Sequence, residues 1–353
     1  MSHAKTSVGL IFGGLSAEHE VSLLSARAIY KHLDKNRFLP LLIYIDKQGR
    51  YAVIDEKTFL TGDFSVPEGH SFIPWAGRTT REIDADIYFP ILHGPNGEDG
   101  RIQGLFDMAG KPYVGANSFS SALAMDKAVT KTLFLNAGLK TPDFLVFTEY
   151  EPQRIRALVS QRLHYPVFVK PCSLGSSVGI SRVKDESGLD RALGLAFRYD
   201  RKILVEQGID AREIEISVMG NKDILISPPG ELVPGNEFYD YADKYLDGKT
   251  VFHIPAQLRE ETGQKIKDMA GKAFRALYLN GMSRIDFFLE KKSGEVFINE
   301  INTIPGFTEI SMFPKLWQVA GISFQELIGR LIDYGFDYHR AGQGLSTDFK
   351  ARD

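Results

Sequence analysis

The chain has 353 residues, enough for two or three domains with hydrophobic cores of their own. Its 42 basic and 45 acidic side chains give a net charge of −3, which disfavours a nucleic-acid partner. The single cysteine, Cys172, excludes an internal disulfide and is expected to be a small buried group. No apolar signal core or membrane-length apolar segment is present, so we expect a cytoplasmic protein with no membrane partner.

Strands and helices alternate through the first third of the chain. Short apolar segments at 7–12, 38–46 and 86–93 predict strands, and apolar residues at helical spacing follow the first and the third. This β-α-β order predicts a mainly parallel sheet. We therefore expect an N-terminal α/β domain over residues 1–120 that contributes to substrate binding.

Strands become more frequent after a predicted helix at 125–137, and they predict two α+β domains. The first, expected over 121–214, contains predicted strands at 143–148, 165–170, 178–183 and 202–207. The second, expected over 215–353, contains a long predicted helix whose apolar face includes Ile266, Ala270 and Phe274, followed by a hairpin.

The hairpin at 282–302 carries the most distinctive polar pattern. Arg284 and Asp286 are two residues apart in its first strand, and Glu300 and Asn302 are two apart in its second, so each pair leaves one face. If the strands pair in register, two carboxylates and a carboxamide converge beside a guanidinium. Oxygen ligands without His or Cys suit Mg²⁺ or Mn²⁺. The alternative is a solvated strand of alternating polarity, against which the irregular Gly-Pro turn that follows argues.

Two further polar segments are expected at the carboxyl ends of strands, where open α/β sheets bind ligands. Glycine-rich residues 93–100 begin with His93, for which a binding and a structural role are both open. Glu18 lies in the first turn of a predicted helix, where it can meet a substrate ammonium group or compensate the helix dipole. Residues 13–18 lack the G-x-G-x-x-G spacing, which disfavours an NAD-dependent dehydrogenase.

The middle of the chain contains the candidate nucleotide-binding residues. Lys127 and Lys170 can reach phosphates as point charges, although each alone is more often a solvated lysine. Glu206 and Gln207 end a predicted strand at a plausible adenine-binding edge, and Glu213 suits ribose hydroxyls. The small-residue loop after Lys170 can bring backbone amides close to an anion, but it fits neither the dinucleotide nor the P-loop pattern.

Six segments, in this order along the chain, resemble segments of the D-alanine–D-alanine ligases of the ATP-grasp superfamily. They are G-G-L-S-A-E-H-E (13–20), H-G-P-N-G-E-D-G (93–100), G-S-S-V-G-I-S (175–181), F-Y-D-Y-A-D-K-Y (238–245), N-G-M-S-R-I-D-F-F (280–288) and N-E-I-N-T-I-P-G-F-T (299–308). The matches extend from about residue 8 to about residue 335. Their ordered occurrence is far more specific than any single motif.

The resemblance implies a three-domain ATP-grasp fold of α/β and α+β domains, with ATP held between the central and C-terminal domains. It also implies the reaction. ATP phosphorylates the carboxylate of one D-alanine, and the amine of a second D-alanine attacks the acyl phosphate. The products are D-alanyl-D-alanine, ADP and phosphate, and the dipeptide supplies peptidoglycan precursors. A homodimer and two Mg²⁺ ions per site, or Mn²⁺, are implied as well, and no protein nucleophile such as Cys172 is needed.

Residue roles also follow from the resemblance. The implied ATP-binding residues are Lys127, Lys170, Ser176, Ser177, Glu206, Gln207, Ile209, Glu213 and Lys244. The implied substrate-binding residues are Glu18, His93, Arg284, Gly306 and Ser311. The implied catalytic residues are Glu18, Ser176, Tyr245, Arg284 and Gly306, with Arg284 and the Gly306 amide acting as an oxyanion hole. The implied metal ligands are Asp286, Glu300 and Asn302.

Two alternatives remain beside the dipeptide-forming enzyme. A D-alanine–D-lactate or D-alanine–D-serine ligase would share most motifs, but segment 238–245 with Tyr245 favours the dipeptide. A non-catalytic nucleotide-binding protein would not need Arg284 together with its three neighbouring oxygen ligands.

Overall fold

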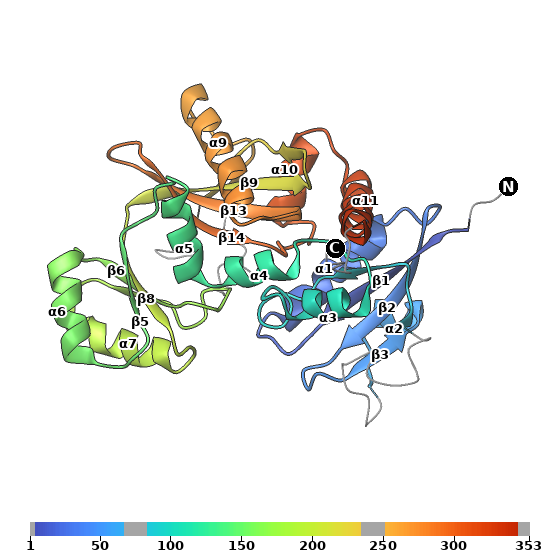
Figure 1. Ribbon diagram of the computed structural model, residues 1–353, viewed down its shortest axis with the longest axis horizontal. Helices are drawn as coiled ribbons and strands as arrows, with labels where there is room; N and C mark the ends of the chain where they lie inside the picture. The colour runs from blue at the N-terminus through green and yellow to red at the C-terminus, as the bar shows by residue number, and fades with distance from the viewer. Residues whose placement is uncertain (1–3, 67–82, 234–250, 345–353) are drawn as a thin grey trace, which may run out of the picture.

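The computed structural model describes residues 4–66, 83–233 and 251–344. Three β-sheets follow one another across the molecule, with the N-terminal sheet at one end, the central sheet at the other and the C-terminal sheet between them (Figure 1). Within the described segments, no helix has the length and apolar character needed to cross a membrane.

The N-terminal sheet has the strand order β3-β2-β1-β4. Its strands are β1 (Thr6–Gly13), β2 (Phe38–Ile45), β3 (Tyr51–Ile54) and β4 (Ile87–Pro90), and its helices are α1 (His19–His32), α2 (Glu56–Thr61) and α3 (Arg101–Ala109). Strand β1 pairs in parallel with β2 and β4, which confirms the predicted parallel core of the sheet. Leu10 and Ile11 face two different hydrophobic clusters, because a parallel strand is covered on both sides.

The central sheet is antiparallel, with the order β5-β8-β6-β7. Its elements are β5 (Phe144–Phe147), α6 (Pro152–Arg162), β6 (Val167–Pro171), β7 (Ser181–Val183), the short 3₁₀ helix η2 (Glu186–Gly188), α7 (Leu189–Phe197) and β8 (Ile203–Gln207). Helices α6 and α7 close its apolar face around Val159, Val169 and Leu193. The other face of the central sheet, which includes Lys170 and Glu206, lines a cleft whose opposite wall is the C-terminal sheet.

The helix predicted at 125–137 is confirmed as α5 (Lys127–Asn136), and a short helix that was not predicted, α4 (Ser118–Met125), directly precedes it. The break lies at Asp126, whose backbone has φ −86° and ψ 100°. Its carboxylate accepts hydrogen bonds from the amides of Ala128 and Val129, which begins a new helix there. Lys127 consequently occupies the first turn of α5.

The C-terminal sheet has the order β12-β11-β9-β13-β14, with β10 paired to β9. Its elements are β9 (Ala211–Gly220), β10 (Ile224–Ile226), β11 (Gly230–Val233), β12 (Val251–His253), α9 (Glu260–Ala276), β13 (Gly281–Glu290) and β14 (Val296–Asn302). Alternate residues of β9 and β13, such as Ile216 and Ile285, pack in a core with α9. Residues between them, such as Glu215 and Asp286, leave the opposite face, which borders the cleft.

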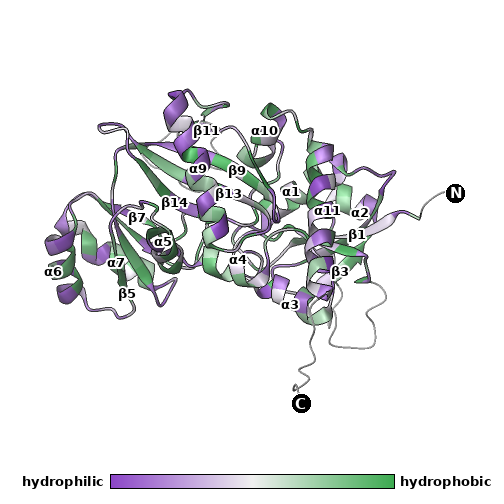
Figure 2. Cartoon of the chain, turned by 45° about the horizontal axis from the view of Figure 1, so that its top comes forward, coloured by the Kyte–Doolittle hydropathy of each residue, from purple (hydrophilic) through white to green (hydrophobic). Residues whose placement is uncertain are grey.

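The last two helices connect the C-terminal part of the chain to the first sheet. They are α10 (Met312–Val319) and α11 (Phe324–Gln343). Leu327 and Leu331 of α11 belong to the same buried cluster as Val8 and Phe89 of the N-terminal sheet. In Figure 2, α9 and α11 carry both hydrophilic and hydrophobic residues while β9 and β13 are largely hydrophobic, as expected for helices that cover sheets. The domain boundaries that the sequence places after residues 120 and 214 stay a prediction.

Cys172 follows β6 and is completely buried, as expected from the sequence. Burial, supported by the charge of Asp126, raises the pKa of the Cys172 thiol to about 12. The thiol is therefore protonated at neutral pH and is a poor nucleophile.

Candidate active site

The hairpin of β13 and β14 has the register that its sequence predicts. Arg284 lies opposite Asn302, and Asp286 lies opposite Glu300, so the four side chains share one face of the sheet. The register shifts between Asp286 and Phe287, immediately beyond these pairs. The predicted convergence of two carboxylates, a carboxamide and a guanidinium is confirmed.

Arg284 is held by two carboxylates. Its Nε and Nη2 donate to the two oxygens of Asp286 at 2.7 Å each, and Nε lies 3.1 Å from Glu215 Oε2. Burial opposes the charge of Arg284, but Asp286 and Glu215 outweigh it and raise its pKa well above the ordinary value. Sequence reasoning missed Glu215, although its spacing from Glu213 within one strand places both residues on the cleft face.

The oxygen donors beside Arg284 fit a hard divalent cation. Asn302 Nδ2 donates a hydrogen bond to Asp286 Oδ2 at 3.1 Å. The carboxamide oxygen of Asn302 is therefore left to serve as a metal ligand beside the carboxylates of Asp286 and Glu300. Among the described residues, the hairpin included, there is no group of three His, Cys, Asp or Glu side chains arranged to hold a metal ion, so the hairpin offers two carboxylates and one carboxamide as ligands. The hairpin is therefore the metal-binding candidate that the donor chemistry supports.

A cavity of about 860 Å³ lies between the central and C-terminal sheets. The predicted nucleotide-binding residues that line it are Lys127, Lys170, Ser177, Glu206, Gln207, Ile209 and Glu213. Asp286 and Glu300 line it as well. The structure therefore brings the predicted nucleotide and metal residues to one cleft, from two separate sheets.

The side chains at the end of β8 are engaged within the protein. Glu206 is paired with Lys170 and with Lys131, a lysine that sequence reasoning did not select. Gln207 Oε1 accepts from the backbone amide of His164 at 2.7 Å, and its Nε2 donates to the carbonyl of the same residue at 2.7 Å. These contacts fix both side chains as parts of the cleft wall.

Lys127 lies where the loop after β6 approaches the hairpin. Its Nζ donates to the carbonyl of Leu174 at 2.7 Å and lies 3.6 Å from Glu300 Oε2. The first turn of α5 therefore places the Lys127 ammonium group between two parts of the site. They are the loop from β6 to β7 (172–180, the glycine-serine loop) and Glu300, a predicted metal ligand.

A second cavity, of about 1,030 Å³, adjoins the first. Its lining includes all the described residues that were predicted to bind substrate, namely Glu18, His93, Arg284, Gly306 and Ser311. The residues that line both cavities are Lys127, Ser177, Ile180, Glu215, Leu232, Arg284 and Glu300. A group bound in one cavity can therefore meet a group bound in the other at Arg284 and Glu300.

The glycine-serine loop contacts the N-terminal domain at the second cavity. Ser176 Oγ donates a hydrogen bond to Glu18 Oε1. Ser176 and Ser177 have φ values of 48° and 60°, which are uncommon for residues other than glycine. Two consecutive residues in this strained region are typical of functional loops.

Both ring nitrogens of His93 have partners in the protein. Nδ1 lies 3.0 Å from the carbonyl oxygen of Ile304, and Nε2 lies 3.0 Å from Ser25 Oγ. Because a carbonyl oxygen only accepts, Nδ1 carries the proton and Nε2 accepts from the Ser25 hydroxyl. Burial lowers the pKa of His93, which keeps the ring neutral.

Ser25 connects His93 to the loop after the hairpin. Its Oγ also accepts a hydrogen bond from the Phe307 amide at 3.2 Å. The amide next to Gly306 is therefore held by a serine of α1, which sequence reasoning did not single out. On the same loop, a Cβ added to Gly306 would lie 2.8 Å from Ser311 Oγ, so this position has little room for a side chain.

Glu98 is a second carboxyl group in the substrate cavity that was not singled out from the sequence. Its Oε2 accepts from the Gly94 amide at 2.7 Å. Burial, followed by the charge of Glu18, raises the pKa of Glu98 to about 8. The cavity thus contains, beside Glu18, a carboxyl group that keeps its proton to a higher pH than an ordinary glutamate.

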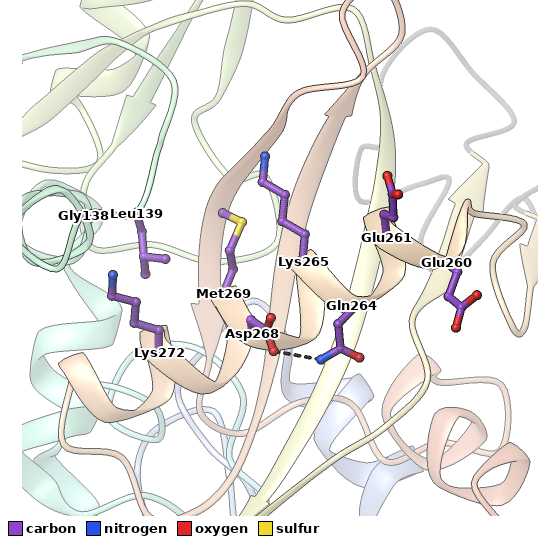
Figure 3. Close-up of a pocket in the computed structure, with 9 residues that line it drawn as sticks. All are labelled: Gly138, Leu139, Glu260, Glu261, Gln264, Lys265, Asp268, Met269 and Lys272. Atoms are coloured by element: carbon purple, nitrogen blue, oxygen red, sulfur yellow. Dashed lines mark hydrogen bonds between the residues drawn. The ribbon is translucent and has the colours of Figure 1, made fainter.

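Lys244 and Tyr245, with the rest of segment 238–245, lie outside the described residues. A separate groove of about 640 Å³ runs along α9 (Figure 3), and a hydrogen bond of 2.8 Å from Gln264 to Asp268 lies along it. Among the described residues that line this groove, none belongs to the predicted site.

Comparisons with known proteins agree with the geometry. Residues 7–116 match the family "D-ala D-ala ligase N-terminus", and residues 133–333 match "D-ala D-ala ligase C-terminus". A D-alanine--D-alanine ligase of a Thermoanaerobacter species is 47% identical over 351 residues, which cover 95% of this chain and 98% of that protein.

Two solved structures are similar over nearly the whole chain. The VanG D-Ala:D-Ser ligase from Enterococcus faecalis has a TM-score of 0.84 and 34% identity, covering 94% of this chain and 100% of that chain. The D-alanine-D-alanine ligase from Coxiella burnetii has a TM-score of 0.83 and 35% identity, covering 96% of each chain. These similarities confirm the predicted ATP-grasp fold. The chain therefore belongs to the D-alanine–D-alanine ligase family.

Proposed function

We propose that the protein joins two D-alanine molecules into D-alanyl-D-alanine, with conversion of ATP to ADP and phosphate, and so supplies peptidoglycan precursors in the cytoplasm. The observation that carries the proposal is the pair of adjoining cavities, which share Lys127, Arg284 and Glu300. One cavity contains the predicted nucleotide residues and the other the predicted amino-acid residues. The curated relative with 47% identity is named for the same activity.

In the first step, a carboxylate oxygen of one D-alanine attacks the γ-phosphorus of ATP. The bond from phosphorus to the β,γ-bridging oxygen breaks, and ADP leaves with the electron pair. Lys127 and Lys170 line the nucleotide cavity and would neutralise phosphate charge as the acyl phosphate forms. Glu213 would bind the ribose, and the segment Glu206 to Ile209 would border the adenine.

In the second step, the neutral amine of the second D-alanine attacks the carbonyl carbon of the acyl phosphate. Arg284 and the Gly306 amide would stabilise the negative charge that develops on the carbonyl oxygen. The tetrahedral intermediate then collapses: the carbon–oxygen bond to phosphate breaks, phosphate leaves with the electron pair, and the nitrogen passes its extra proton to water. Removal of one oxyanion donor typically costs about 10²- to 10³-fold in turnover.

The first D-alanine would be oriented by groups at the end of the N-terminal sheet. Glu18 would bind its ammonium group, and Ser176 donates to Glu18 from the loop that also borders the nucleotide cavity. Tyr245 and Lys244 would complete this loop-to-loop closure, and Ser311 would contact the carboxylate of the amino acid. His93 borders the same cavity.

The oxygen donors of the hairpin are proposed to hold the divalent cations of the reaction. Asp286, Glu300 and Asn302 would hold two Mg²⁺ ions, or Mn²⁺, at the phosphates. When bound, these ions neutralise phosphate charge and favour phosphoryl transfer. The family resemblance also supports a homodimer, which analytical ultracentrifugation would measure.

Product analysis tests the proposed function. Purified protein with ATP and Mg²⁺ is expected to release phosphate only when D-alanine is present, and D-alanyl-D-alanine is expected to accumulate. Phosphate release that does not change when D-alanine is omitted would contradict the ligase assignment. Incubation with D-alanine plus D-serine or D-lactate distinguishes the alternatives, because a mixed product in excess over the dipeptide would assign the second substrate differently.

A further inference from the structure

Lys131 is a buried cation that the proposed mechanism does not use. It lies on α5, one helical turn after Lys127, and its side chain is only 1% exposed. A lysine with so little exposure is rare unless its ammonium group is paired. Its partners therefore indicate what it does.

The ammonium group of Lys131 has one ion-pair partner and two hydrogen-bond acceptors. It pairs with Glu206 Oε1, donates to Thr141 Oγ1 at 2.9 Å and donates to the backbone carbonyl of Asn299 at 3.2 Å. The three partners come from three different segments. Glu206 ends β8 of the central sheet, Thr141 follows α5, and Asn299 belongs to β14 of the C-terminal sheet.

The charge balance around Lys131 depends on the same contacts. Burial opposes the ionisation of Glu206, but the ammonium groups of Lys131 and Lys170 outweigh it and hold the pKa of Glu206 below its ordinary value. Burial in turn lowers the pKa of Lys131, which the Glu206 carboxylate opposes. Loss of one partner from such a buried set leaves uncompensated charge and allows the remaining side chains to move.

Two of the three partners of Lys131 lie beside residues that are predicted to bind the nucleotide or the metal ions. Glu206 also pairs with Lys170, the predicted phosphate-binding lysine of β6. Asn299 directly precedes Glu300, a predicted metal ligand. One ammonium group thus connects Glu206, the partner of a predicted phosphate-binding lysine in the central sheet, to the strand of a predicted metal ligand in the C-terminal sheet.

We propose that Lys131 is a positioning residue for nucleotide binding, which fixes Glu206, and through it Lys170, relative to the strand of Glu300 before the nucleotide enters. The inference rests on the proposed function, because the nucleotide is taken to be the ATP of that reaction. Lys131 itself is not among the residues that line the nucleotide cavity. Its effect is exerted through the separation and orientation of groups that do.

The test measures binding of ADP with Mg²⁺ in the absence of D-alanine, by isothermal titration calorimetry. Lys131→Met keeps a similar volume and removes the three donors, and it is expected to weaken ADP binding at least tenfold. Lys131→Arg, which retains the charge and the donors, is expected to recover part of the affinity. The matched control is Lys140→Met. Lys140 also connects the segment after α5 to the hairpin, but through an exposed ion pair with Glu295. The ADP affinity of the Lys140→Met protein is expected to stay within twofold of that of the wild type.

Steady-state kinetics separates positioning from general damage. Lys131→Met is expected to raise the KM for ATP while the KM for D-alanine changes less than threefold. A folded Lys131→Met protein with wild-type ADP affinity, or with equal losses for ATP and D-alanine, would overturn the proposal. If Lys131→Met does not fold, Thr141→Val removes one acceptor isosterically; at least twofold weaker ADP binding is expected, and unchanged binding overturns the proposal.

The binding measurement, unlike the kinetic one, is independent of the ligase assignment. ADP binding is measured without an amino acid, whereas the proposed function is tested by D-alanine-dependent phosphate release. Wild-type protein that binds ADP but forms no dipeptide would refute the function and leave the role of Lys131 to be decided by the variants.

Discussion

The Ser176 hydroxyl donates a hydrogen bond to the Glu18 carboxylate, although the two residues are 158 positions apart in the sequence. Ser176 belongs to the loop between β6 and β7, and the residue after it, Ser177, lines the nucleotide cavity. Glu18 directly precedes α1 of the N-terminal domain. This contact therefore connects the nucleotide cavity to the predicted site of the substrate ammonium group.

Ser176→Ala is expected to lower kcat/KM for D-alanine by about 10- to 100-fold, because a hydrogen bond to a charged group contributes about 1.5–3 kcal/mol. The measurement is phosphate release at varied D-alanine with saturating ATP. Ser187→Ala is the control, since Ser187 makes a similar hydroxyl–carboxylate contact with Asp185 at an exposed position. Wild-type kcat/KM in the Ser176 variant would show that the contact has no role in binding D-alanine.

Asp286→Ala and Glu300→Ala are each expected to abolish most of the turnover while the protein remains folded. Both residues border the cleft, and their carboxylates are proposed to hold the cations that neutralise phosphate charge. Activity is measured over a Mg²⁺ titration, with circular dichroism as the check of folding. Glu290→Gln is the control, because Glu290 is a half-buried carboxylate at the other end of β13 that does not line the cleft. Wild-type rates in both alanine variants would remove the hairpin from the metal site.

Ser25→Ala is expected to lower kcat by about tenfold with a smaller change in KM. The hydroxyl is the partner of both His93 Nε2 and the Phe307 amide, so its loss frees the loop that carries Gly306. Ser22→Ala is the control for loss of a buried hydroxyl of α1, because Ser22 contacts Gly13 and Ile91 instead of the loop. Equal kcat values for the two variants would show that the contact with Phe307 has no special role.

Glu98 is expected to make stability depend on pH in a defined window. Its pKa is raised to about 8 in the folded protein, so between about pH 4.5 and pH 8 the folded chain keeps a proton that the unfolded chain has released. The free energy of unfolding therefore falls as pH rises through this window, by about 1.4 kcal/mol for each unit of pKa difference. Glu98→Gln retains an acceptor for the Gly94 amide and is expected to flatten this slope. Urea unfolding at several pH values measures it, and parallel slopes would contradict the assignment.

The hairpin was predictable because its information is local. Residues two apart in a strand share a face, and a short turn pairs Asp286 with Glu300, so the register and the convergence of the four polar side chains follow from the sequence. The parallel order of β1, β2 and β4 was predictable for a similar reason, since apolar strands alternate with amphipathic helices.

The supporting residues were not predictable because their partners are distant in the sequence. Ser25 and His93 are 68 positions apart, and Lys131 and Asn299 are 168 apart, so neither pair forms a local pattern. Lys131 has the same residue type as the solvated lysines around it, and only its burial distinguishes it. The separation of α4 from α5 at Asp126 also depends on a side-chain cap, which hydrophobic spacing does not reveal.

The position of α11 has a consequence for the newly synthesised chain. Leu327 and Leu331 of this last helix complete a core that begins with Val8 and includes Phe89. At ribosomal rates of about 5–20 residues per second, roughly 10–50 s separate the emergence of the first sheet from that of its cover. During this interval the nascent sheet presents an apolar face that a chaperone can bind. A fragment that ends before α11 is accordingly expected to bind a hydrophobic dye that the whole chain excludes.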